Sequence, residues 1–190
     1  MPPDKLQWQA FSMVYIGFDN GVTSNGIGVL DCSGKSWLYK LPVKKESSYT
    51  KEEKFIRRID FESLVCLFKD IKQMFDNDAK FLVGLERPMV NSRRFNASLS
   101  AIRALEATLI AVEHVKFDKV YIDSKEWQSN LLPGVKGSDE LKKASFNLGK
   151  ELFPTLNIKK DADGLLIAEY LRRKGAEQPK ENAIRLPDRL

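Results

Sequence analysis

Two short apolar segments of this chain run directly into an acidic residue. Residues 13–18 are followed by Asp19, and residues 81–85 are followed by Glu86. Apolar runs of this length, bounded by polar or turn residues, are typical of buried strands. A carboxylate beside such a strand is rarely buried unless it is paired or binds a metal. These segments therefore constrain the chain to a fold in which two buried strands each end on an acid.

An acidic pair also precedes an apolar segment late in the sequence. Asp161 and Asp163 stand before residues 165–171, whose composition predicts a helix. If the three element ends converge, their carboxylates form an anionic pocket that suits a divalent cation. Mg²⁺ prefers oxygen ligands and keeps several waters, so a few carboxylates are enough. Two such ions about 3.5–4 Å apart activate a water and stabilise a leaving oxygen, which predicts metal-assisted phosphodiester chemistry.

Each acid also has an interpretation that involves no metal. Asp19 fits a turn aspartate before Asn20, and Glu86 fits a surface glutamate at a strand end. Asp163 fits an ordinary negative charge in the first turn of a helix. Asp161 is equally compatible with a metal ligand and with a simple N-cap. Convergence of these side chains in space separates the two interpretations.

The remaining sequence predicts an α/β fold, a five-stranded mixed sheet flanked by helices. Three early strands joined by short polar connections form an antiparallel meander, and β-α-β crossovers then add two parallel strands. The predicted strands are residues 13–19, 26–31, 36–43, 80–86 and 119–123. The predicted helices are residues 53–75, 97–115, 138–152 and 161–174, with a surface loop over residues 44–54. The first and fourth strands are then central neighbours, which brings Asp19 and Glu86 to the same sheet edge.

Length and composition are those of an ordinary soluble globular protein. The chain has 190 residues, of which 43% are hydrophobic and 30% are charged. A chain of this length can form a hydrophobic core without stabilising disulfides or metals. Residues 1–175 are predicted to form one domain, and residues 176–190 a C-terminal arm or tail. No segment approaches the roughly 18 apolar residues of a membrane span, and the N-terminus lacks the pattern of a secretory signal. We therefore expect a cytoplasmic protein with no membrane partner.

Cysteine and histidine usage argues against other site chemistries. Cys32 and Cys66 lie on apolar stretches without metal-ligand spacing, so we expect them to be reduced thiols in the core. His114 is the single histidine and lies in a helical stretch. A zinc site or a histidine-based catalytic triad is therefore disfavoured.

Basic residues gather directly after Glu86. The net charge is +5, and no acidic residue occurs between Arg87 and Leu105. A basic lip beside an anionic metal pocket suits phosphates, which dominate nucleic-acid affinity. The basic residues of this stretch are Arg87, Arg93, Arg94 and Arg103, and Lys136, Lys142 and Lys143 form a second basic border. Each of these seven residues also fits a solvated surface charge.

Taken in order, the three acidic segments resemble the motifs of the RuvC-type Holliday junction resolvases, which belong to the RNase H-like superfamily. The matching segments are Ile16–Gly21, Leu85–Pro88 and Asp161–Ala168. The resemblance runs from about Met13 to Leu171. It is closest to phage-encoded members, which carry stretches similar to Arg94–Glu106 and Lys136–Glu140. The resemblance implies an RNase H-like fold and, for a phage protein, the cytoplasm of a bacterial host.

The resemblance also implies an activity, a cofactor and a partner. RuvC-type resolvases are homodimers that bind a four-way DNA junction, and each subunit nicks one strand with two Mg²⁺ or Mn²⁺ ions. By motif position, Asp19, Glu86 and Asp163 are the implied metal ligands. The usual fourth acid of the family falls here on Lys160, and Asp161 is displaced from that position by one place.

Further roles follow from the same motif positions. Lys142, or equally Lys143, falls near a lysine that resolvases place close to the scissile phosphate. Met89 lies three residues beyond Glu86, where some members carry an aromatic that contacts a base near the crossover. The predicted helix at residues 97–115 is the implied dimer interface, although its apolar stripe also fits an intramolecular core.

We therefore predict a structure-selective DNA endonuclease of the crossover junction type. One alternative is an RNase H-like nuclease that acts on RNA–DNA hybrids, flaps or forks, because a fold does not fix a substrate. A second alternative is a nucleic-acid-binding module without catalysis. A third is a sugar-kinase or actin-like ATPase, which also opens with an Ile-Gly-x-Asp-x-Gly strand. Those ATPases need a second nucleotide-binding half and a longer chain than this one.

Overall fold

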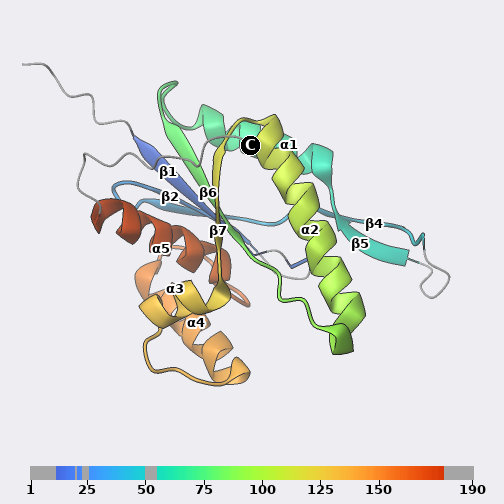
Figure 1. Ribbon diagram of the computed structural model, residues 1–190. Helices are drawn as coiled ribbons and strands as arrows, with labels where there is room; N and C mark the ends of the chain where they lie inside the picture. Colours follow the sequence, from blue (N-terminus) through green and yellow to red (C-terminus); the bar gives the residue numbers. More distant parts are fainter. Residues whose placement is uncertain (1–11, 20, 23–25, 50–54, 178–190) are drawn as a thin grey trace, which may run out of the picture.

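A mixed five-stranded sheet lies at the centre of the molecule (Figure 1). The computed structural model describes residues 12–19, 21–22, 26–49 and 55–177. The strand order is β3-β2-β1-β6-β7, with β1–β2 and β2–β3 antiparallel and β1–β6 and β6–β7 parallel. The strands are β1 (Met13–Phe18), β2 (Ile27–Asp31), β3 (Ser36–Tyr39), β6 (Lys80–Glu86) and β7 (Asp118–Ile122). This topology confirms the predicted α/β fold and the central position of the first and fourth predicted strands.

Helices cover both faces of the sheet (Figure 1). One face carries α1 (Phe61–Gln73) and α2 (Phe95–His114). The other carries α5 (Asp163–Glu177), with α3 (Ser124–Leu131) and α4 (Ser138–Leu152) packed beside it. Successive residues of β1 enter the core on opposite faces, which explains why this strand is apolar almost throughout.

A two-stranded hairpin replaces the predicted surface loop and the first turns of the predicted helix. Strand β4 (Val43–Ser47) pairs antiparallel with β5 (Phe55–Ile59), and α1 begins only at Phe61. Charged side chains line the surface of the hairpin: Glu46 pairs with Lys44 of the same strand at 2.8 Å and with Arg58 of β5 at 2.7 Å. Its exposed charged residues resemble a loop in sequence, which is why the prediction failed there.

Two further helix predictions were wrong in detail. Helix α5 continues to Glu177, so Gly175 does not end it. A Cβ at Gly175 would lie 2.4 Å from the Tyr15 hydroxyl, so this glycine serves close packing rather than helix termination. Helix α3 was not predicted, because it is short and mostly polar. Residues 178–190 of the predicted tail lie outside the described residues.

Two expectations from composition were also wrong. Cys32 and Cys66 are free, exposed thiols rather than core residues. One segment, Ser92–His114, is long and apolar enough to cross a membrane by length and composition alone. It comprises the short 3₁₀ helix η1 (Ser92–Arg94) and α2. In this structure 28% of the apolar window of that segment is buried, and α2 packs against α1 and β5.

Glycines allow the start of α5 to lie directly on β1 and β2. A Cβ added to Gly17 would lie 2.0 Å from the Gly164 carbonyl oxygen. A Cβ at Gly28 would lie 2.4 Å from the Leu165 Cα and 2.6 Å from the Gly164 carbonyl carbon. The close approach brings Asp163, the first residue of α5, to the end of the sheet where β1 terminates.

We expect Gly28→Ala to destabilise the protein by about 3 kcal/mol, the upper end for an overpacked core, because the new methyl group meets backbone that cannot rotate away. Urea unfolding followed by circular dichroism measures this. Gly26→Ala is the matched control, since its Cβ would meet chiefly the movable end of the Leu38 side chain. Equal stability of the two variants would contradict the packing described above.

Candidate metal centre

The sheet register brings two of the predicted acids to neighbouring positions. In the parallel pair of β1 and β6, Phe18 is opposite Leu85. Asp19 and Glu86 are the residues that follow these two in the sequence. Adjacent strands lie about 4.8 Å apart. Both acids thus lie at the carboxyl ends of central parallel strands, where open α/β sheets commonly bind ligands.

Asp163 approaches the same edge from the start of α5 and is hydrogen-bonded to Ser145 of α4. Burial raises the pKa of Asp163 from 3.8 to about 6, against a hydrogen bond from Ser145, which lowers it. The carboxylates of Asp161 and Glu86 raise this pKa further, and Lys142 lowers it. These mutual effects place Asp161, Glu86 and Lys142 within electrostatic reach of Asp163.

The remaining candidates lie just before α5 and on α4. Asp161 lies in the segment before α5, outside the helix, and is partly buried. Lys160, the family position for the fourth acid, is exposed. Lys142 and Lys143 are both exposed on α4, and Lys142 acts on the charge of Asp163.

Trp127 is a residue of this site that the sequence did not reveal. Its side chain is completely buried, and its indole Nε1 donates a hydrogen bond of 3.1 Å to Glu86 Oε1. A buried partner of this kind fixes the orientation of a carboxylate. A single tryptophan within the polar helix α3 is the signal that was available, but its partner is 41 residues away in sequence.

We expect Trp127→Phe to lower any metal-dependent activity by about 10–100-fold, the range for losing a partner of a metal ligand, because Phe fills most of the space but donates no hydrogen bond. The Mg²⁺ concentration for half-maximal rate should rise, which a purely structural defect would not produce. Trp37→Phe on β3 is the control, since Trp37 packs edge-on against Phe75 away from the acids. Unchanged Mg²⁺ dependence in Trp127→Phe would contradict a positioning role.

The predicted DNA-contacting residues lie on the surface around this edge. Arg87 follows Glu86, forms an ion pair with Asp123 at 3.4 Å, and lies over the Tyr121 ring. Met89 is 76% exposed. The remaining four, Arg93, Arg94, Lys136 and Lys143, are all exposed. In Figure 1 the N-terminal end of α2 and the helices α3 and α4 project on either side of the carboxyl ends of β6 and β7.

The donor set fits a hard divalent cation. Oδ1 of Asp163 is buried and has no hydrogen-bond partner, and such an atom calls for an explanation such as a bound ion. A cation would also lower the raised pKa of this carboxyl. Within the described ranges, no three His, Cys, Asp or Glu side chains are already arranged as an ion cage. The ligand roles of Asp19, Glu86, Asp161 and Asp163 therefore stay predictions.

Comparisons with known proteins identify the fold. No family model matches the sequence, and no curated protein matches it. The structure of Thermus thermophilus RuvC has a TM-score of 0.55 and 20% identity, covering 86% of this chain and 97% of that chain. T. thermophilus RuvC in complex with a Holliday junction substrate has a TM-score of 0.52 and 16% identity, covering 86% and 96%. The chain thus has the RNase H-like fold of RuvC.

Proposed function

We propose that this protein is a metal-dependent DNA endonuclease that cleaves phosphodiester bonds at four-way junctions. The observation that carries the proposal is that Asp161 and Glu86 lie close enough to Asp163 for their charges to raise its pKa. The register of β1 and β6 brings Asp19 beside Glu86. The shared fold adds support, since one of the similar structures is a RuvC bound to a Holliday junction substrate.

Asp19, Glu86 and Asp163 would hold Mg²⁺ or Mn²⁺, two ions in each site, with Asp161 as a further ligand. Bound ions of this kind supply an activated water and stabilise the leaving oxygen of the phosphodiester. Trp127 and Ser145 keep two of the carboxylates in place. Lys142 offers a positive charge to the phosphate that lies against these acids.

The surrounding surface suits branched DNA. Arg93 and Arg94 of η1 would contact DNA phosphates on one side, and Lys136 and Lys143, before and within α4, on the other. Arg87, directly after β6, would add a further positive charge. Met89 is exposed and apolar beside this basic surface. Apolar side chains can insert between base steps where DNA is bent or open, so Met89 would contact bases near the crossover.

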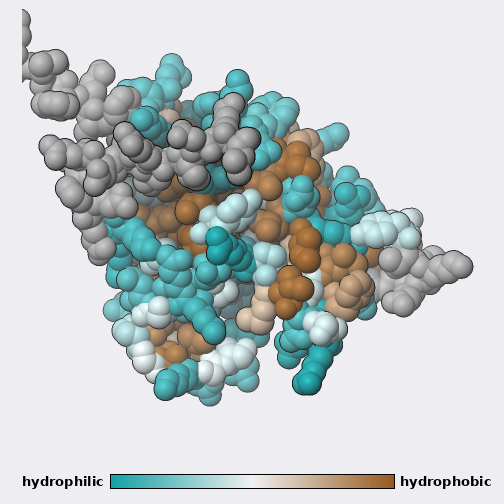
Figure 2. Space-filling model, viewed as in Figure 1, coloured by the Kyte–Doolittle hydropathy of each residue, from teal (hydrophilic) through white to brown (hydrophobic). Residues whose placement is uncertain are grey.

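We assign the exposed side of α2 to a homodimer interface. Phe95 and Ile102 are 66% and 42% exposed along this helix, and Figure 2 shows apolar side chains gathered over it. Contiguous exposed apolar surface commonly marks a protein contact. Two subunits related by a two-fold axis would present two sites to a four-way junction, one for each strand to be nicked.

Nicking of labelled four-way junction, fork, flap and RNA–DNA hybrid substrates, compared side by side with Mg²⁺, tests the proposal. The expected result is paired nicks in the junction, lost with a chelator, and little cleavage of linear duplex. Preferential cleavage of the hybrid, flap or fork would favour the second candidate function, an RNase H-like nuclease of other specificity that uses the same acids. Junction binding without cleavage of any substrate would favour a binding-only module.

A further inference from the structure

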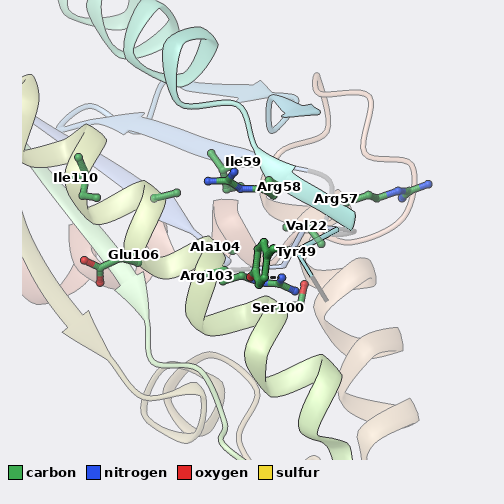
Figure 3. A pocket seen from close by; sticks show the side chains of 11 residues that line it. Val22, Tyr49, Arg57, Arg58, Ile59, Ser100, Arg103, Ala104, Glu106 and Ile110 are labelled. Atoms are coloured by element: carbon green, nitrogen blue, oxygen red, sulfur yellow. Dashed lines mark hydrogen bonds between the residues drawn. The ribbon is translucent and has the colours of Figure 1, made fainter. Parts of the chain in front are cut away.

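A charged cavity lies between the β4–β5 hairpin and α2, apart from the acids described above (Figure 3). Its volume is about 280 Å³, just below the usual range of small-molecule pockets and large enough for a single phosphate group. We propose that this cavity binds a phosphate of the DNA backbone, with Arg103 as its anchor. The assignment of DNA as occupant rests on the proposed function. Residues that line the cavity include Val22, Tyr49, Arg57, Arg58, Ser100 and Arg103.

Arg103 is set up to bind an oxyanion. Its Nη1 donates a hydrogen bond of 2.5 Å to the Tyr49 hydroxyl, and its guanidinium lies 5.4 Å from the centre of the Tyr49 ring. Its Nε is buried and has no hydrogen-bond partner. Leaving such a donor unsatisfied is unfavourable, which favours a bound acceptor. The Nε–Nη2 edge of a guanidinium is a planar fork that binds two phosphate oxygens at once.

The surroundings of Arg103 favour an anion over an internal partner. Arg58 lines the cavity and is paired with Glu46, a residue of the neighbouring strand. Among the ion pairs of the described residues, none involves Arg57, Arg103 or Glu106. Figure 3 shows the Glu106 carboxylate directed away from Arg103. Figure 3 also shows the Arg57 guanidinium directed away from the cavity. Because Arg58 is paired with Glu46, the Arg103 guanidinium supplies the positive charge that would attract an anion.

The cavity is close enough to the candidate metal centre to bind the same DNA strand. Its wall residue Val22 is three residues beyond Asp19. Three residues of extended chain span at most about 11 Å. Successive phosphates of one strand lie farther apart than the axial rise of roughly 3.4 Å per nucleotide, so this distance spans fewer than about three nucleotides. A phosphate in the cavity would therefore fix the strand close to the bond to be cleaved.

The first arm of the test uses inorganic phosphate and needs no nuclease activity. Thermal unfolding is measured in sodium phosphate and in sodium chloride of the same ionic strength. Phosphate should raise the midpoint of the wild-type protein, and Arg103→Gln should lose this shift. Ser100→Glu is a second variant on an accessible position, and its carboxylate, one helical turn from Arg103, would occupy the fork. Lys72→Gln, an exposed charge on α1, should keep the wild-type shift.

The second arm measures binding of a labelled four-way junction without divalent metal, as a function of salt. Loss of one phosphate contact should reduce the slope of log affinity against log salt by about 0.9 and weaken binding about eightfold at 0.1 M salt. Arg103→Gln and Ser100→Glu should both show this change, and Lys72→Gln should not.

The two arms separate this inference from the proposed function. If both variants keep the wild-type phosphate shift and salt slope, the inference is overturned even where the protein nicks junctions normally. A lost phosphate shift with an unchanged salt slope, or with no DNA binding at all, would overturn DNA as the occupant. If both effects appear but no substrate is cleaved, the subsite stands and the nuclease proposal fails.

Discussion

Replacing Asp19 by Asn should lower Mg²⁺-dependent nicking of a four-way junction by roughly 10⁴-fold, the loss seen when a central catalytic acid is removed. Asn keeps the size of the side chain but removes the charge that would hold the cation. Asp19 follows a strand whose residues 14–18 are all buried, so the backbone at the site should not move. Junction binding without metal should remain, because it depends on basic residues elsewhere.

Asp78→Asn is the matched control for this experiment. Asp78 is exposed and precedes β6, at the opposite end of the strand from Glu86. The control should cleave and bind like the wild-type protein. Cleavage by Asp19→Asn at the wild-type rate would remove Asp19 from the mechanism. Loss of junction binding along with cleavage would point to a folding defect instead.

Asp163→Asn should stabilise the metal-free protein at neutral and alkaline pH. The pKa of Asp163 is raised from 3.8 to about 6, chiefly by burial, so the folded state disfavours its charged form. Stability from this group is fully present below pH 3.8 and is lost as the pH rises through about 6. A shift of this size corresponds to at most about 3 kcal/mol. Asn carries no charge at any pH, so the variant does not lose this stability as the pH rises.

Urea unfolding of wild type and Asp163→Asn at several pH values measures this difference. The variant should be the more stable at pH 8, and the two proteins should converge near pH 3.5. Mg²⁺ or Mn²⁺ at pH 8 should stabilise the wild-type protein but not the variant, because binding to the folded state alone raises stability. A constant difference across the pH range, or equal stabilisation by metal, would contradict the burial and ligand role assigned to Asp163.

The central sheet could be predicted because its evidence is local. Residues 13–18 are apolar because both faces of β1 are covered, and the same holds for most of β6. Turn residues such as Asp31, whose carboxylate accepts hydrogen bonds from the Ser33 and Lys35 amides, mark the hairpin between β2 and β3. The short connections predicted antiparallel neighbours, and the β-α-β connections predicted the parallel strands, which together gave the strand order.

The rest depends on contacts between residues distant in sequence. The β4–β5 hairpin carries exposed charges, with Glu46 paired to Lys44 in its own strand and to Arg58 across the hairpin, and these charges leave no apolar period to detect. The hydrogen bond from Trp127 to Glu86 requires α3 to lie under the end of β6. Arg103 looked like any other basic residue after Glu86, and its role as a cavity residue appears only once α2 faces the hairpin.

Anomalous diffraction from crystals soaked in Mn²⁺ tests the central claim most directly, because it locates the metal without relying on activity. The account predicts manganese peaks at the carboxyl ends of β1 and β6, coordinated by carboxylate oxygens of Asp19, Glu86 and Asp163, and no peak there in Asp163→Asn. Manganese bound elsewhere, with none of these three side chains among its ligands, would contradict it.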